Sequence, residues 1–303
     1  MSPFIVSLVA ISAVLHVAWN VRLKTAGDAL RAATIGMLAA AVGIVPGGVL
    51  VWWMGGAHAL PADGIALGIA SGVVEAAYFV FLAAAYRRGD LSVVYPLARG
   101  SAPLLAVAVG VGALGERLGI AGSLGVVALF AGFLWLQRPW RALALARRGA
   151  RGGAARRTAL DSPVLFALAT GVTIATYTTI DRLGTRLIEP VPYAAILWAT
   201  CSLILIAWVA FVAGGDLFRD GTDGARRAAV GGWLTLGAYL CILGALSVAP
   251  LSGVAPLRES ATVFAAAWGS VRMGEAADRA EVGRRVGASV LIVGGALLLT
   301  FGG

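Results

Sequence analysis

The chain has 303 residues, of which 59% are hydrophobic and only 13% are charged. A soluble domain carries about 25% charged residues, so this composition excludes an ordinary water-soluble protein and indicates an integral membrane protein. Two histidines, two cysteines and one lysine argue against a multi-histidine metal site, a disulfide framework and a phosphate-binding loop. We therefore expect no metal and no other cofactor.

Apolar runs long enough to cross a bilayer recur between clusters of charge along the chain. A membrane-spanning helix needs roughly 20 mostly apolar residues. The sequence predicts ten such helices, at about residues 3–21, 32–53, 64–86, 91–113, 118–137, 162–181, 190–213, 228–248, 251–271 and 284–302. The first run lacks a preceding basic segment, so we expect a retained helix rather than a cleaved signal peptide. The predicted fold is an all-α polytopic membrane protein.

Glycines recur at four-residue spacing on one face of the third predicted helix, at Gly64, Gly68 and Gly72. Small residues let membrane helices approach closely. The face could therefore pack against another helix of the same chain, which we favour, or against a second copy. The protein is expected to be a monomer or a homodimer.

A basic linker, residues 138–161, divides the chain near its middle and holds seven arginines. Successive loops carry nineteen Lys or Arg residues in the odd loops and three in the even loops. Positive charge favours the cytoplasmic side of a membrane. We therefore expect a cytoplasmic linker that contacts anionic lipid headgroups, both termini outside, and no nucleic-acid partner.

The regions on either side of the linker, 1–137 and 162–303, contain an internal repeat. Residues 91–97 (LSVVYPL) match 251–257 (LSGVAPL), and residues 99–116 are identical to 258–275 at eight of eighteen positions. Five helices in each half is an odd number, so the second copy must be inverted in the membrane. Such inverted five-helix repeats are typical of secondary transporters, with a site near the midplane between the halves.

Motifs spread along the chain also resemble those of one transporter family. They are LHVAWNVRLK (15–24), AYRRGDLSVVYPLARGSAP (85–103), LGERL (114–118), TYTTIDRLGTR (176–186) and APLSGVAPLRESATVFAA (249–266). With the helix pattern, they resemble the drug/metabolite transporter superfamily, and within it the EamA-like ten-helix proteins. The resemblance implies a transporter of small organic molecules, often an exporter of amino acids or other metabolites. The excess of Arg over Lys, with abundant Ala and Gly, indicates a bacterial cytoplasmic (inner) membrane.

Charged residues within predicted helices are candidate functional groups, because a charge at the bilayer centre is unfavourable and usually faces inward. Glu75 lies near the middle of the third helix, on the same face as Ser71 and Tyr78. It could exchange a proton during transport, or it could be a static partner of an arginine. Glu259 is the second candidate carboxylate for proton coupling, although its neighbour Arg258 could already neutralise it.

Further polar and aromatic residues within the predicted helices are candidates for binding substrate. Arg99 and Arg258 occupy equivalent repeat positions shortly after a proline and could bind a carboxylate or phosphate group, or pair with Glu75 or Glu259. The remaining candidates could contact substrate or serve packing, and they are His16, Trp19, Asn20, Tyr78, Tyr95, Tyr177 and Tyr239.

We expect a secondary transporter of small organic metabolites, whether amino-acid-like, anionic or amphipathic, that acts as an exporter and is proton-coupled through Glu75. A non-transporting membrane scaffold is an alternative, but it would not need charges at membrane depth. An intramembrane enzyme is a weaker alternative, because no Ser–His pair, aspartate pair or acidic metal-binding cluster is evident in the predicted helices.

Overall fold

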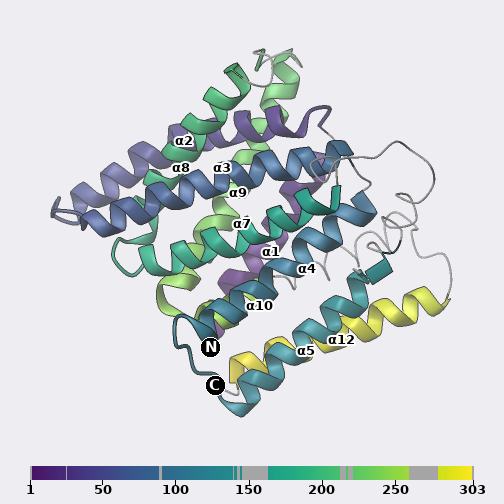
Figure 1. Cartoon of the computed structure of the whole chain (residues 1–303). Helices are drawn as coiled ribbons and strands as arrows, with labels where there is room; N and C mark the ends of the chain where they lie inside the picture. The colour runs from purple at the N-terminus through teal and green to yellow at the C-terminus, as the bar shows by residue number, and fades with distance from the viewer. Residues whose placement is uncertain are drawn as a thin grey trace. The chain divides into compact units, whose positions relative to one another are not determined.

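The computed structural model describes residues 2–24, 26–88, 91–138, 140, 141, 144, 163–211, 216, 217, 221–258 and 279–301. These residues contain ten helices: α1 (Pro3–Lys24), α2 (Ala29–Met54), α3 (Ala62–Arg88), α4 (Leu91–Gly112), α5 (Ile120–Gln137), α7 (Pro163–Gly184), α8 (Pro190–Phe211), α9 (Gly221–Val248), α10 (Leu251–Arg258) and α12 (Arg279–Phe301) (Figure 1).

The helices follow the predicted segments closely, with one clear difference. Helix α9 begins at Gly221 rather than near residue 228. Its first turns include Arg226 and Arg227, which the prediction assigned to a loop because they are charged. The basic linker and the second part of the ninth predicted segment lie outside the described residues. Within the described part, α2, α3, α7, α8 and α9 are long and apolar enough to cross a membrane. The predicted all-α polytopic membrane fold is confirmed.

The chain divides into two compact units. Unit 1 comprises residues 1–10, 81–175 and 250–303, and unit 2 comprises residues 11–80 and 176–249. Each unit draws on chain from both sides of the basic linker. The units therefore differ from the two predicted five-helix repeats, which remain a prediction.

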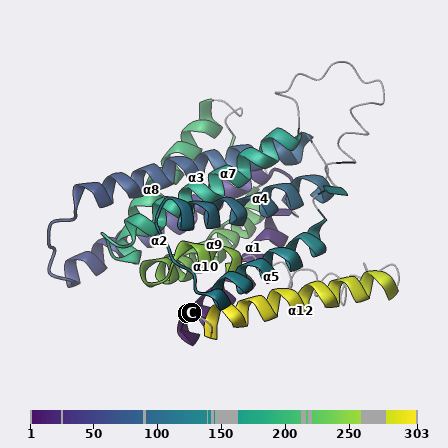
Figure 2. The ribbon, with the colours of Figure 1, turned by 60° about the horizontal axis from the view of Figure 1, so that its bottom comes forward.

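In unit 1, α5 lies alongside α12 over its length (Figures 1 and 2). A Cβ added at Gly132 would lie 2.8 Å from the carbonyl oxygen of Ala288, so the two backbones approach closely at this glycine. Val126, Leu129 and Ile292 form the buried apolar contact between the two helices. Small residues and interdigitated aliphatic side chains together hold this pair, as expected for helices in lipid.

Unit 1 also contains a helix cap supplied by a distant carboxylate. Oε1 of Glu116 accepts a hydrogen bond from the backbone N–H of Leu251 at 2.6 Å, and Oε2 accepts one from Ser252 at 2.8 Å. Glu116 follows Gly115, whose φ of +66° is a backbone conformation that glycine adopts without strain. Gly115 and Glu116 close a turn and place a carboxylate at the positive N-terminal end of α10.

In unit 2, α2 packs against both α8 and α9. The approach to α9 is closest at Gly36 and Gly232, where a Cβ added at Gly232 would collide with the carbonyl oxygen of Gly36. Gly48 makes a similar approach to Ala195 of α8. These positions require glycine because no side chain fits between the backbones.

The predicted glycine face of α3 packs within the chain. A Cβ added at Gly68 would lie 3.0 Å from Ile196, and one at Gly72 would lie 2.7 Å from the carbonyl oxygen of Leu197, both in α8. Gly64 meets Ile188, just before the same helix. The favoured intramolecular interpretation of this face is confirmed.

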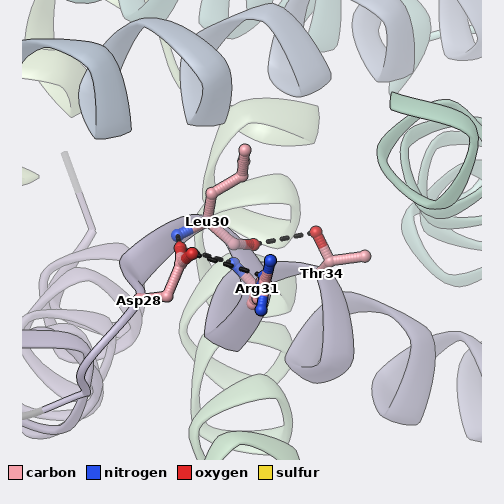
Figure 3. A network of polar contacts seen from close by, with 4 residues as sticks. All are labelled: Asp28, Leu30, Arg31 and Thr34. Atoms are coloured by element: carbon pink, nitrogen blue, oxygen red, sulfur yellow. Dashed lines mark hydrogen bonds and ion pairs between the residues drawn. The ribbon is translucent and has the colours of Figure 1, made fainter. Parts of the chain in front are cut away.

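The N-terminus of α2 is capped locally, as Figure 3 shows. Oδ1 of Asp28 accepts hydrogen bonds from the backbone N–H groups of Leu30 and Arg31, at 3.0 and 3.2 Å. Oδ2 also forms an ion pair with Nε of Arg31 at 3.4 Å. The cap satisfies donors that a helix start otherwise leaves open.

Candidate functional site

A buried carboxylate, Asp181, ties four helices of unit 2 together. Its side chain is 1% exposed. Oδ1 accepts hydrogen bonds from the hydroxyls of Ser71 on α3, at 2.5 Å, and Tyr193 on α8, at 3.0 Å. Oδ2 accepts one from Tyr239 on α9, at 2.5 Å. An ionised carboxylate can accept hydrogen bonds but cannot donate them. Three hydroxyl donors therefore stabilise the charged form of Asp181 among these apolar helices.

The position of Asp181 in α7 explains why it needs these donors. It lies in the last turn of α7, where the helix dipole disfavours a negative charge. The neighbouring Arg182 is also buried, and its Nη1 donates a hydrogen bond to the carbonyl oxygen of Leu246 on α9 at 2.6 Å. The end of α7 thus joins the other helices of unit 2 through two consecutive buried charged residues.

Glu75 belongs to the same buried region of unit 2. Its side chain is 3% exposed, and it lies one helical turn after Ser71 on α3. Both Glu75 and Asp181 interact electrostatically with the phenols of Tyr193 and Tyr239. Two buried carboxylates therefore belong to the same region of unit 2.

Three predicted tyrosines come together beside these carboxylates. The ring centroids of Tyr78 and Tyr177 are 6.0 Å apart, and those of Tyr177 and Tyr239 are also 6.0 Å apart. Trp198 of α8 extends the series, 5.1 Å from Tyr239. The result is a continuous row of buried aromatic rings drawn from α3, α7, α8 and α9.

The predicted polar face of α1 is partly described. His16 and Trp19 are both buried, with ring centroids 6.2 Å apart in an edge-on arrangement. Trp19 also faces Phe79, the neighbour of Tyr78 on α3, at 6.3 Å. Asn20 belongs to α1, but its side chain lies outside those described.

The remaining predicted site residues belong to unit 1 or lie outside the described part. Arg258 is the last residue of α10 and is buried. Tyr95 and Arg99 are on α4, with side chains outside those described, and Glu259 lies outside the described residues. Helices α4 and α10, which carry the two matching Pro-Leu segments of the predicted repeat, pack against each other in unit 1.

Unit 2 contains a cavity of about 380 Å³ lined by the C-terminal part of α1, the N-terminal half of α2 and the first half of α9. Trp19 lines it, and so does Phe79 of α3. Among the described residues, no group of three or more His, Cys, Asp or Glu side chains is placed to hold a metal ion.

Sequence analysis missed Asp181, Arg182 and Tyr193. The sixth predicted helix ended at Asp181, and charged residues are common at the ends of membrane helices, so Asp181 was not singled out. In the structure α7 continues to Gly184. One sequence pattern could have indicated it, because Tyr177 and Asp181 are one turn apart and lie on the same helix face. The three donors come from positions 110, 12 and 58 residues away, which the sequence alone does not bring together.

The fold and this buried polar cluster define a polytopic membrane protein with ionisable groups enclosed among its helices. The model of the EamA-like transporter family matches residues 161–301. This part of the chain is similar to that family, which lies within the drug/metabolite transporter superfamily that the sequence motifs indicated. The family that this part of the chain resembles is a family of membrane transporters.

A crystal structure of another protein has the same fold. Its TM-score is 0.66, its sequence is 21% identical, and the match covers 98% of this chain and 96% of that one. The comparison with curated proteins gives no match. The structural likeness extends over almost the whole chain, including the part that the family model leaves out.

Proposed function

We propose that this transporter is a secondary exporter of small organic metabolites, amino-acid-like, anionic or amphipathic, and that protons drive it through Glu75. The observation that carries the proposal is the pair of buried carboxylates in unit 2, Glu75 and Asp181. Buried ionisable groups in membrane helices are unfavourable unless they have a function or a partner.

The two carboxylates have different surroundings, which favours different roles. Asp181 accepts hydrogen bonds from three hydroxyls, and these stabilise its negative charge. A second negative charge in the same enclosed region is unfavourable. Glu75 is therefore the carboxyl that takes up a proton in one state of the transport cycle and releases it in another, while Asp181 keeps the surrounding helices in place.

The predicted orientation supports export. The odd loops carry most of the positive charge and are expected in the cytoplasm. In a bacterial inner membrane the proton gradient points inward. A single carboxyl that is exposed in turn to each side of the membrane is therefore sufficient to exchange an inward-moving proton for an outward-moving metabolite. Because the two arginine-bearing segments belong to predicted equivalent repeat positions, Arg99 and Arg258 are the proposed contacts for an anionic group of the substrate.

The test is proton flux in proteoliposomes loaded with the pH-sensitive dye pyranine. Each of the twenty amino acids is added separately on one side, and the one that gives the largest proton signal is then followed in radiolabelled form. We expect Glu75→Gln to abolish pH-driven accumulation but to retain exchange at equal pH, because glutamine is nearly isosteric and carries no proton. Asp63→Asn, which changes an exposed carboxylate in the first turn of the same helix α3, is the matched control and should keep both activities.

Two results would reject proton coupling through Glu75. One is wild-type flux that does not respond to the pH gradient, and the other is a Glu75→Gln variant with full gradient-driven activity. Absence of flux for every amino acid and for a panel of organic acids would favour the scaffold alternative.

A further inference from the structure

We propose that the cavity of about 380 Å³ within unit 2 is a binding site for a small organic anion that carries a flat apolar group. Ligand pockets commonly have volumes of a few hundred cubic ångströms, mostly apolar walls and a few convergent polar groups. Six of the lining residues define its chemistry, and they are Trp19, Arg22, Phe79, Arg227, Gly231 and Thr235.

The apolar wall is aromatic. Trp19 and Phe79 are each 4% exposed, and their ring centroids are 6.3 Å apart with the planes tilted by 54°. Small residues of α2 and α9, among them Gly36 and Gly232, also line the cavity. A flat apolar group stacks favourably against such aromatic faces.

Trp19 also supplies a hydrogen-bond donor. Its Nε1 is buried, and none of the residues that the structure describes provides it with a hydrogen-bond acceptor. An indole N–H only donates, and buried tryptophans usually have an acceptor. A carboxylate or similar oxygen of a ligand in the cavity would supply the acceptor.

The charge of the lining favours an anion. Arg22 and Arg227 contribute to it, and among the described residues no carboxylate does. The first turn of α9 also lines the cavity and presents the positive end of that helix.

Gly231 gives independent support for an open space at this point. It is buried, yet a Cβ added to it would meet no atom of the described residues within 4 Å. A buried position without neighbouring atoms must border an unfilled volume. A larger side chain at position 231 would therefore extend into the cavity, because its Cβ would not collide with the backbone of a neighbouring helix.

The test measures binding rather than transport, so its result does not depend on proton coupling at Glu75. Full-length protein in phosphatidylcholine nanodiscs is titrated calorimetrically with 2-naphthoate, and with the neutral amide 2-naphthamide as the matched ligand. We expect one saturable site for naphthoate, weakened by added salt, and affinity for the amide lower by about tenfold or more because it lacks the charge.

Variants locate the site. Gly231→Leu should abolish naphthoate binding, whereas Gly47→Leu should retain it, because Gly47 is also a helical glycine of unit 2 with open space but does not line the cavity. Trp19→Phe keeps the aromatic ring and removes the donor, so it should weaken binding by about fivefold to tenfold. Arg227→Gln should weaken binding and make it less sensitive to salt.

Equal binding of naphthoate and naphthamide would overturn the proposal, as would wild-type affinity in Trp19→Phe or Gly231→Leu, or no naphthoate binding at all. The anion could be a soluble metabolite or a lipid headgroup. Nanodiscs that contain phosphatidylglycerol distinguish these sources, because an anionic lipid that occupies the site would lower the apparent affinity for naphthoate. Unchanged affinity in those nanodiscs would assign the site to a soluble anion.

Discussion

The hydroxyl of Tyr239 on α9 donates a hydrogen bond of 2.5 Å to Oδ2 of Asp181 on α7, across 58 residues of sequence. The other carboxylate oxygen, Oδ1, is held by Ser71 and Tyr193. Each oxygen thus fixes a different set of helices, and the contact with Tyr239 is the direct link between α7 and α9 at this carboxylate. Its contribution to stability can be isolated by mutation.

We predict that Tyr239→Phe lowers the free energy of unfolding by about 1–3 kcal/mol, because it removes a hydrogen bond to a charged group inside the protein. Asp181→Asn should lower it at least as much, since the amide presents donors to hydroxyls that are themselves donors. The measurement is reversible unfolding in mixed micelles with increasing sodium dodecyl sulfate.

A double-mutant cycle separates this contact from general damage to the site. If Tyr239 and Asp181 interact directly, the double variant should lose less stability than the sum of the two single losses. Strict additivity would contradict the contact. Ser247→Ala, which removes only a local hydroxyl bond to Gly244 within α9, is the control and should have little effect.

The cap of α10 gives a second prediction, this time for unit 1. Glu116→Ala leaves the N–H groups of Leu251 and Ser252 without their acceptor and should destabilise the protein by about 1 kcal/mol, the usual effect of losing a helix cap. Glu116→Gln keeps one carbonyl oxygen and should lose less. If Glu116→Ala and Glu116→Gln were both as stable as the wild type, the cap would not contribute.

The crossing of α2 and α9 gives a third prediction. Gly232→Ala places a methyl group against the backbone of Gly36, which cannot move away as a flexible side chain could. We expect a loss of about 1–3 kcal/mol, typical of overpacking. Gly47→Ala is the matched control, because its added Cβ meets no atom within 4 Å. The control should be neutral or slightly stabilising, since alanine favours a helix over glycine.

The fourth prediction concerns topology. A single cysteine at position 150, in a background with Cys201→Ala and Cys241→Ala, should react with a membrane-impermeant maleimide only in inside-out vesicles. The reason is the excess of arginine in the linker, which favours the cytoplasmic side. Labelling in intact cells would contradict the orientation.

The sequence predicted the helices well because lipid selects directly for long apolar segments. It also predicted the packing face of α3, because Gly64, Gly68 and Gly72 lie on one side of the helix and allow another helix to approach closely there. The boundary of α9 was wrong because Arg226 and Arg227 extend the helix beyond the apolar run that the prediction followed.

The candidate site was harder to predict because it depends on which helix faces meet. Glu75, Tyr177 and Tyr239 were recognised as unusual within apolar segments, and the structure places them in one buried region. Asp181 was not recognised, because its importance comes from Ser71, Tyr193 and Tyr239 on other helices. Apolar periodicity contains no information about such pairings.

The division of the chain into interleaved units constrains how the protein can be synthesised. Helix α2 is made early, but its partners α8 and α9 emerge much later, and α5 must wait for α12, the last described helix. Neither unit can be completed from the first half of the chain alone. During translation, the early helices must therefore enter the bilayer before their glycine faces have their native partners, and a ribosome that stops before α12 leaves α5 without its most extensive contact.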